Sequence, residues 1–199
     1  MEKRQVILVT DGDNVAKTSL EVAARRIGGR CISLSAGNPS HLSGPELVEL
    51  IKQAANDPVL VMFDDCGLAK EGAGEQALKY VATHPDIEVL GAIAVASNCK
   101  KSKGTPVHVT INQFGQLASH GVDKFGRTKY HHPLRIFGDT VEVLNEVSIP
   151  FVVGIGDIGK MDRKDDVEIG APVTTKAIQL ILDHYDRFVE SPNNRERNR

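Results

Sequence analysis

Short, continuously apolar runs alternate along this chain with longer segments in which apolar residues recur every three to four positions. The first run, Val6 to Val9, lies between charged residues and the turn Thr10-Asp11-Gly12-Asp13. Comparable runs cover residues 59–63, 89–96 and 151–155, and a second short strand, with two serines, is predicted over 31–35. Continuous runs of this length are typical of parallel strands that are buried on both faces.

The intervening segments have the apolar spacing and the end signals of helices. The spacing predicts a helix over 14–27, which the Gly28-Gly29 pair ends. A second helix begins at Ser43, where Glu46 completes a capping box, and the last helix covers 174–188. The alternation predicts an α/β fold in a single domain, residues 1–190. We expect one doubly wound, mainly parallel sheet, flavodoxin-like or Rossmann-like, with the flavodoxin-like strand order 2-1-3-4-5. The polar tail 191–199 is expected to be disordered.

The strand-helix rhythm breaks after the fourth predicted strand. Between Val107 and Asn112, apolar and polar residues alternate with the period of a half-exposed strand. The segment Asn112-Gln113-Phe114-Gly115 is a good hairpin turn with glycine at the left-handed position. We therefore expect a small β-hairpin inserted near residues 106–120.

Composition excludes several classes of function. The 199 residues carry a formal net charge of −2, only 5% are aromatic and tryptophan is absent, which argues against a nucleic-acid partner. No signal peptide and no apolar run of about 18 residues is visible, so we expect a soluble protein without a transmembrane segment. The cysteines, Cys31, Cys66 and Cys99, have no metal-type spacing and suggest folding in a reducing cytoplasm.

Carboxylates follow three of the predicted strands. Asp11 and Asp13 follow the first, Asp64 and Asp65 the third, and Asp157 the fifth. Ligands of such sheets bind outside the carboxyl ends of the strands, where these side chains would converge. Oxygen ligands suit Ca²⁺ or Mg²⁺, although aspartate is also common in these turns because it caps helices. The sequence thus predicts no obligatory cofactor but allows a Ca²⁺ or Mg²⁺ site.

The fifth strand leads into a glycine-rich turn, residues 154–160, that is neither a Walker loop nor a dinucleotide-binding loop. Its glycines are suited to tight turns and to close packing of a helix on a strand. Lys160, at the end of this turn, is a candidate to pair with a carboxylate-bearing ligand.

The same acidic turns resemble the motifs of haloacid dehalogenase-like phosphohydrolases. In that interpretation Asp11 is the nucleophile, Asp13 the acid/base, and Asp157 with Asp162 holds Mg²⁺. Ser97 and either Lys124 or Lys129 would supply the remaining motifs. Each match is short, and Gly-Asp pairs after strands are frequent in α/β proteins.

Longer segments resemble the stage V sporulation protein AE family in its soluble SpoVAEa form, from Bacillus-type spore formers. They are VILVTDGD (6–13), IGGRCISLSAGNP (27–39), VMFDDCG (61–67), HPDIEVLGAIAVA (84–96), GVDKFG (121–126) and VGIGDIGKM (153–161). The resemblance implies a component of the SpoVA apparatus, which moves dipicolinic acid with Ca²⁺ into the developing spore and releases it during germination. It also implies peripheral association with the spore inner membrane and, as partners, SpoVAD and the membrane-embedded SpoVA proteins. It brings no catalytic residues with it.

Three functions follow from these observations. The first is a non-enzymatic accessory or regulatory subunit of the SpoVA complex. The second is a Mg²⁺-dependent phosphohydrolase that uses Asp11 and Asp13. The third is a protein that binds Ca²⁺ or calcium dipicolinate at the acidic strand ends. The ligand or metal candidates shared by these hypotheses are Asp11, Asp13, Asp64, Asp65, Asp157 and Lys160.

Overall fold

A seven-stranded, mainly parallel sheet forms the centre of the protein, in a computed structural model that describes residues 2–65, 72–98 and 102–191. The strand order is β2-β3-β1-β4-β9-β6-β7. In this order the strands are β2 (Arg30–Cys31), β3 (Val59–Met62), β1 (Arg4–Val9), β4 (Ile87–Val95), β9 (Val152–Ile155), β6 (Val109–Ile111) and β7 (Leu117–Ala118). The α/β class and the mainly parallel sheet are confirmed.

The expected strand order 2-1-3-4-5 is wrong, because β3 lies between β2 and β1. All four residues of β3 are buried, as a position inside the sheet requires. The segment 31–35 forms a strand of only two residues, β2, and then turns into a short 3-10 helix, η1 (Ser33–Ser35). A strand this short suits an edge, where few backbone groups are left unpaired.

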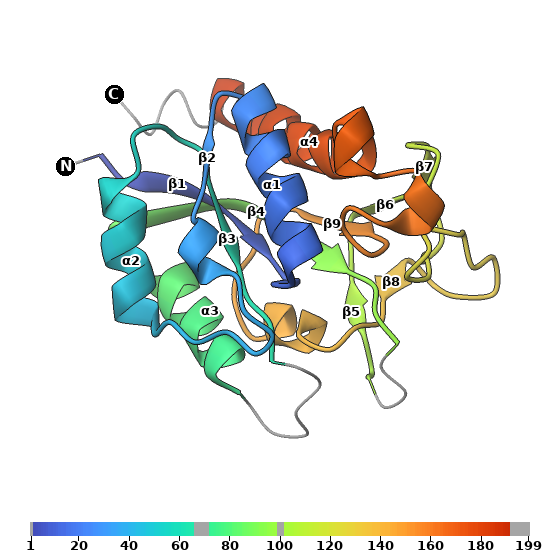
Figure 1. Cartoon of the computed structure of the whole chain (residues 1–199), viewed down its shortest axis with the longest axis horizontal. Coiled ribbons are helices and arrows are strands. Elements are labelled where there is room, and N and C mark those ends of the chain that lie inside the picture. Colours follow the sequence, from blue (N-terminus) through green and yellow to red (C-terminus); the bar gives the residue numbers. More distant parts are fainter. Residues whose placement is uncertain (1, 66–71, 99–101, 192–199) are drawn as a thin grey trace.

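Helices cover both faces of the sheet, so the doubly wound prediction is confirmed (Figure 1). Helices α1 (Asn14–Arg26) and α4 (Pro172–Glu190) pack together on one face. Helices α2 (Gly44–Gln53) and α3 (Ala73–Thr83) pack together on the other. Each face therefore encloses its own apolar cluster.

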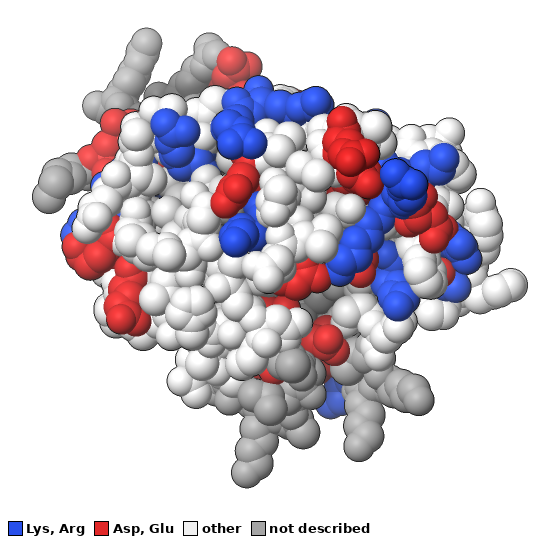
Figure 2. Space-filling view, in the orientation of Figure 1, with Lys and Arg blue, Asp and Glu red and all other residues white. Residues whose placement is uncertain are grey.

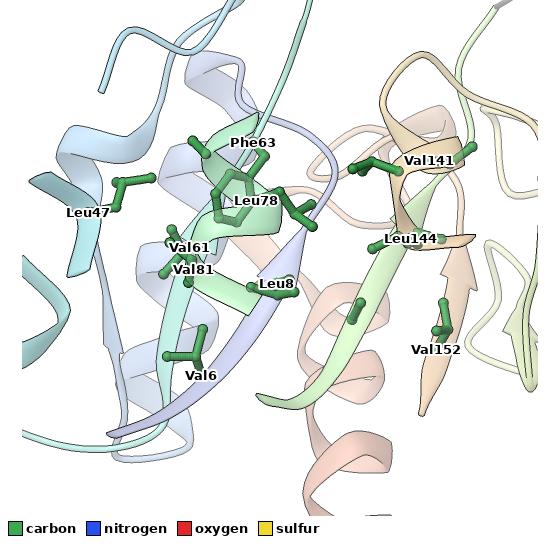
Figure 3. Close-up of a cluster of buried hydrophobic side chains, with 14 of the residues drawn as sticks. Val6, Leu8, Leu47, Val61, Phe63, Leu78, Val81, Val141, Leu144 and Val152 are labelled. Carbon is green, nitrogen blue, oxygen red and sulfur yellow. The ribbon is translucent and has the colours of Figure 1, made fainter. Parts of the chain in front are cut away.

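Alternate residues of β1 enter these two clusters. Val6 and Leu8 point into the cluster beneath α2 and α3, and Ile7 and Val9 into the cluster beneath α1 and α4. Figure 3 shows the first of these clusters, in which side chains from β1, β3, α2 and α3 meet. The same cluster continues to β9 and to a 3-10 helix, η2 (Val141–Asn145). The central strand is thus enclosed on every side, and only its ends reach the surface.

The predicted hairpin is present, and Gly115 adopts the expected left-handed conformation at its turn, with φ +73°. It is part of the main sheet, because β6 runs parallel to β9 and the antiparallel β7 extends the sheet by one strand. A separate two-stranded antiparallel sheet joins β5 (Thr105–Pro106) to β8 (Arg135–Ile136). The insertion thus widens the sheet on the side of β9.

The predicted helix ends are confirmed at α1 and α2. The carboxylate of Asp13 accepts hydrogen bonds from the N–H groups of Val15 and Ala16, both at 2.8 Å, and Gly28 follows α1 with φ +76°. At α2, the carboxylate of Glu46 accepts a hydrogen bond from the N–H of Ser43 at 2.8 Å. Predictions made for Cys66, Cys99 and residues 192–199 of the tail concern positions outside the described residues.

A fully buried carboxylate, Asp165, connects the turn after β9 to the first turn of α4. Its Oδ1 accepts hydrogen bonds from the N–H groups of Val173 (2.7 Å) and Thr174 (3.0 Å). Its Oδ2 accepts from the N–H of Gly159 (2.9 Å) and from the hydroxyl of Thr174 (2.6 Å). This carboxylate fixes Gly159 and, with it, the position of the following residue, Lys160.

Candidate functional site

A pocket of about 240 Å³ opens where β1, β4 and β9 end. Because these neighbouring strands are parallel, their carboxyl ends lie at the same edge of the sheet. The pocket is lined by Thr10, Asp11, Asp13, Asn38, Asp64, Val95, Ala96, Ser97, Asn98, Lys124, Asp139, Thr140, Asp157 and Lys160. Five of the six predicted site residues, all but Asp65, are therefore in one place.

The ammonium group of Lys160 lies between two of the pocket carboxylates. Its Nζ is 2.6 Å from Oδ2 of Asp13 and 3.0 and 3.1 Å from the two carboxylate oxygens of Asp157. Burial alone would lower the pKa of Lys160, but these hydrogen bonds raise it above its usual value. Burial alone would also raise the pKa of Asp13, and the bonds to Lys160 and to the first turn of α1 bring it below normal. Lys160 and Asp13 are therefore both charged at neutral pH.

A strained turn places this lysine. Met161, Asp162 and Arg163, directly after it, all have positive φ values, of 44°, 54° and 65°. Left-handed backbone costs roughly 1–2 kcal/mol for each residue other than glycine. The buried side chain of Met161 and the ion pair between Arg127 and Asp162 (2.6 Å) hold the turn in place. Strain of this kind often occurs where a structure must aim a functional side chain.

Asp11 is the most perturbed carboxyl of the pocket. Its side chain is only 8% exposed, and its Oδ1 accepts one long hydrogen bond, 3.3 Å, from the N–H of Asp13. Its Oδ2 is buried and has no hydrogen-bond partner among the described residues. Burial first, and then the nearby charges of Asp13 and Asp157, raise the pKa of Asp11 to about 7. Asp11 thus exchanges its proton near neutral pH.

The two aspartates that follow β3 have different roles. Asp64 lines the pocket. The side chain of Asp65 points to α3, where its oxygens accept hydrogen bonds from the N–H groups of Gly74 and Glu75, both at 2.7 Å. Asp65 therefore secures the beginning of a helix, which is the ordinary role of aspartate after a strand.

The residues of the phosphohydrolase hypothesis only partly meet. Ser97 and Lys124 line the pocket together with Asp11, Asp13 and Asp157. Asp162, however, pairs with Arg127 at 2.6 Å, and Lys129 pairs with Asp123 at 2.9 Å. Neither Asp162 nor Lys129 is among the residues that line the pocket.

The pocket carboxylates are not arranged as a metal centre. Within residues 2–65, 72–98 and 102–191, no three His, Cys, Asp or Glu side chains are grouped so that they could hold a metal ion. Asp13 and Asp157 instead share the ammonium of Lys160. A metal ion that used either carboxylate would have to displace this ammonium.

Sequence reasoning missed Asn38, Asn98, Asp139 and Thr140 as pocket residues. Asn38 and Asn98 follow the second and fourth predicted strands, so their position after strands was a usable signal. Asp139 also lines the pocket, and its N–H donates to the hydroxyl of Ser97 at 3.0 Å. That contact joins segments 42 residues apart and leaves no local pattern in the sequence.

The fold and the site together define the class of protein. It is an α/β domain with a charged, carboxylate-rich pocket at the ends of its central strands. The family model described as stage V sporulation protein AE1 matches residues 5–185. The chain therefore belongs to the stage V sporulation protein AE family, and the resemblance noted in the sequence is confirmed. No curated protein and no solved structure matches it. Family membership identifies a sporulation protein and a component of the SpoVA system.

The surface agrees with the modest net charge. Figure 2 shows acidic and basic side chains interspersed over one face of the molecule, without a continuous patch of either sign among the coloured residues. Among the described residues, no helix has both the length and the apolar character needed to cross a membrane.

The raised pKa of Asp11 predicts how stability depends on pH. The native state holds the proton of Asp11 up to about pH 7, whereas an aspartate in the unfolded chain has a pKa of 3.8. Between these values a rise in pH ionises the unfolded state first, so the native protein loses up to about 4 kcal/mol of stability. Asp11→Asn, which resembles the protonated carboxyl in shape, lacks this loss. Between pH 4 and pH 8, we therefore expect the free energy of unfolding of Asp11→Asn to rise by several kcal/mol relative to that of the wild type.

Urea unfolding at several pH values measures this difference. Asp186→Asn is a matched control, because Asp186 is exposed and its substitution should change the pH profile little. Parallel pH profiles for Asp11→Asn and the wild type would contradict the prediction.

The left-handed turn gives a second prediction. Arg163 has φ +65° and an 85% exposed side chain, so Arg163→Gly removes strain at little cost in contacts. We expect the substitution to stabilise the protein by about 0.5–1 kcal/mol in urea unfolding. Lys164→Gly is the control, because Lys164 has right-handed backbone (φ −81°) and glycine there should destabilise by about 0.5–1 kcal/mol. Equal effects of the two substitutions would show that the turn is unstrained.

Proposed function

We propose that this protein is a non-enzymatic accessory or regulatory subunit of the SpoVA complex. It acts in the uptake of dipicolinic acid with Ca²⁺ during sporulation and in its release during germination. The observation that carries the proposal is the family match over residues 5–185, which includes almost every element of the fold. In this proposal the protein associates with the spore inner membrane through protein contacts, with SpoVAD or the membrane-embedded members as partners.

The state of the pocket supports a role without catalysis. Asp11 is buried and largely protonated below about pH 7, and a protonated carboxyl is a poor nucleophile. Asp13 is engaged both as a helix cap and as an ion-pair partner of Lys160. Asp13 is therefore not free to serve as the acid/base that the hydrolase hypothesis requires.

The second candidate is the Mg²⁺-dependent phosphohydrolase. It is favoured by the meeting of Asp11, Asp13, Ser97, Lys124 and Asp157 in one pocket. Turnover of a generic phosphate ester with Mg²⁺, abolished by Asp11→Asn, would replace the non-enzyme proposal with this one. Binding of Ca²⁺ or calcium dipicolinate is the third candidate, and calorimetry with Ca²⁺, Mg²⁺ and dipicolinate tests it directly. Absence of heat at millimolar ligand would remove that candidate.

The accessory role predicts capture of specific partners. The full chain, tagged and expressed in place of its own copy in a spore former, should retain other SpoVA proteins when it is purified from spore inner membranes. A tagged α/β protein of similar size and charge from another family is the control. Recovery of this protein without any SpoVA protein would contradict the proposal.

The same strains separate an accessory role from catalysis. Deletion of the chain should slow the release of dipicolinic acid during germination or lower its content in mature spores. Asp11→Asn should restore most of the wild-type content and release, because the proposal assigns no chemistry to this carboxyl. Loss of both in Asp11→Asn, at wild-type protein level, would favour the hydrolase or ligand-binding hypotheses instead.

A further inference from the structure

The strand-end pocket already binds one ammonium group, that of Lys160. This group donates hydrogen bonds to Asp13 and Asp157 at 2.6–3.1 Å. Asp13 and Asp157 are thus spaced to receive an –NH₃⁺ group with short, charge-assisted hydrogen bonds.

Lys160 does not satisfy all the acidic groups. Among the described residues that line the pocket, five are aspartates and two are lysines, Lys124 and Lys160. Asp139 forms no ion pair within the described part of the chain. The described residues that line the pocket therefore carry more acidic than basic side chains, and such a lining attracts cations and repels anions.

Asp11 supplies an independent sign of a missing partner. Its side chain is more than nine-tenths buried and lines the pocket, and its Oδ2 has no hydrogen-bond donor among the described residues. Buried polar atoms without partners are rare in native proteins, and one in a pocket points to an absent ligand. Only a donor satisfies this oxygen once the carboxyl is ionised.

We propose that the strand-end pocket binds a small primary amine, whose ammonium group is held by Asp11 and Asp139, the two pocket carboxylates to which the described residues supply no cationic partner. The volume of about 240 Å³ lies below the roughly 300–1,000 Å³ of pockets for drug-sized ligands, so the amine is small. Ser97, Asn38 and Asn98 supply neutral hydrogen-bonding groups for the rest of the ligand. A metal ion fits less well, because the described residues contain no metal-type group of carboxylates.

This proposal goes beyond the accessory role and does not depend on it. It concerns what the pocket holds, and the partner capture described above concerns where the chain docks. Either can fail while the other stands.

Amine binding should become tighter as the pH rises from 6 to 8. Asp11 has to lose its proton to act as a full acceptor, and it does so near pH 7. The charged groups around it are Asp13, Asp157 and Lys160, and the pocket also contains Asp64, Asp139 and Lys124. Alkylammonium groups, like the side chain of lysine, remain protonated over this range. The change in affinity therefore reports the ionisation of Asp11 and not that of the amine.

The experiment is a titration of the full-length, ¹⁵N-labelled protein, with the amide signals of Gly12, Asp13 and Ser97 as reporters. Ethylammonium and 1,4-diaminobutane are the probes. Tetramethylammonium carries the same charge but no N–H donor, and is the matched control. Ca²⁺, Mg²⁺ and inorganic phosphate are added separately, each at constant ionic strength.

We expect saturable shifts with the primary amines, weaker or no shifts with tetramethylammonium, and none with phosphate. Asp11→Asn and Asp139→Asn should each weaken binding at least about tenfold, and Asp186→Asn, outside the pocket, should leave it unchanged. Lys160→Gln should tighten binding, since it frees Asp13 and Asp157. Equal shifts from tetramethylammonium, tighter binding of a divalent metal than of any amine, or binding of phosphate alone would each overturn the proposal. The absence of any shift at about 50 mM amine would also overturn the proposal, because even a weak specific site, with a millimolar Kd, is nearly saturated at that concentration.

Discussion

The ammonium of Lys160, held between Asp13 and Asp157, is the interaction on which the acidic edge of this sheet depends. Three parallel strands end side by side, and each brings at least one polar or acidic residue to the same small volume. Carboxylates this close repel one another in surroundings of low dielectric constant. A single lysine offsets much of that repulsion because its ammonium bonds to two of them at once. The rest of the local structure serves to keep this lysine in place.

That support is unusual in its form. After Lys160, three consecutive non-glycine residues, Met161 to Arg163, have left-handed backbone. Before Lys160, the N–H of Gly159 donates a hydrogen bond to the buried carboxylate of Asp165. The fold thus accepts backbone strain and a buried carboxylate around one side chain. The result is a pocket whose electrostatics are fixed by the turn after β9 and by the first turn of α1. Any ligand that needs Asp13 or Asp157 has to compete with a cation that is covalently part of the protein.

The sequence was most informative where a feature is local. Continuous apolar runs located β1, β3, β4 and β9, and Ser43 and the Gly28-Gly29 pair located helix ends. The order of the strands could not be read, since it depends on pairing between runs whose apolar content is alike. Five of the six site residues were found because parallel strands send their carboxyl ends to one edge, which is a rule of topology.

What the sequence could not supply was the direction of individual side chains. Asp64 and Asp65 are neighbours after the same strand, yet Asp64 lines the pocket and Asp65 accepts hydrogen bonds from the first turn of α3. Likewise, Lys160 and Asp13 are hydrogen-bonded although they are 147 residues apart in the sequence. No local sequence pattern indicates the four hydrogen bonds that Asp165 accepts. These long-range contacts decide which carboxylates are already neutralised. They therefore decide which chemistry the pocket can perform.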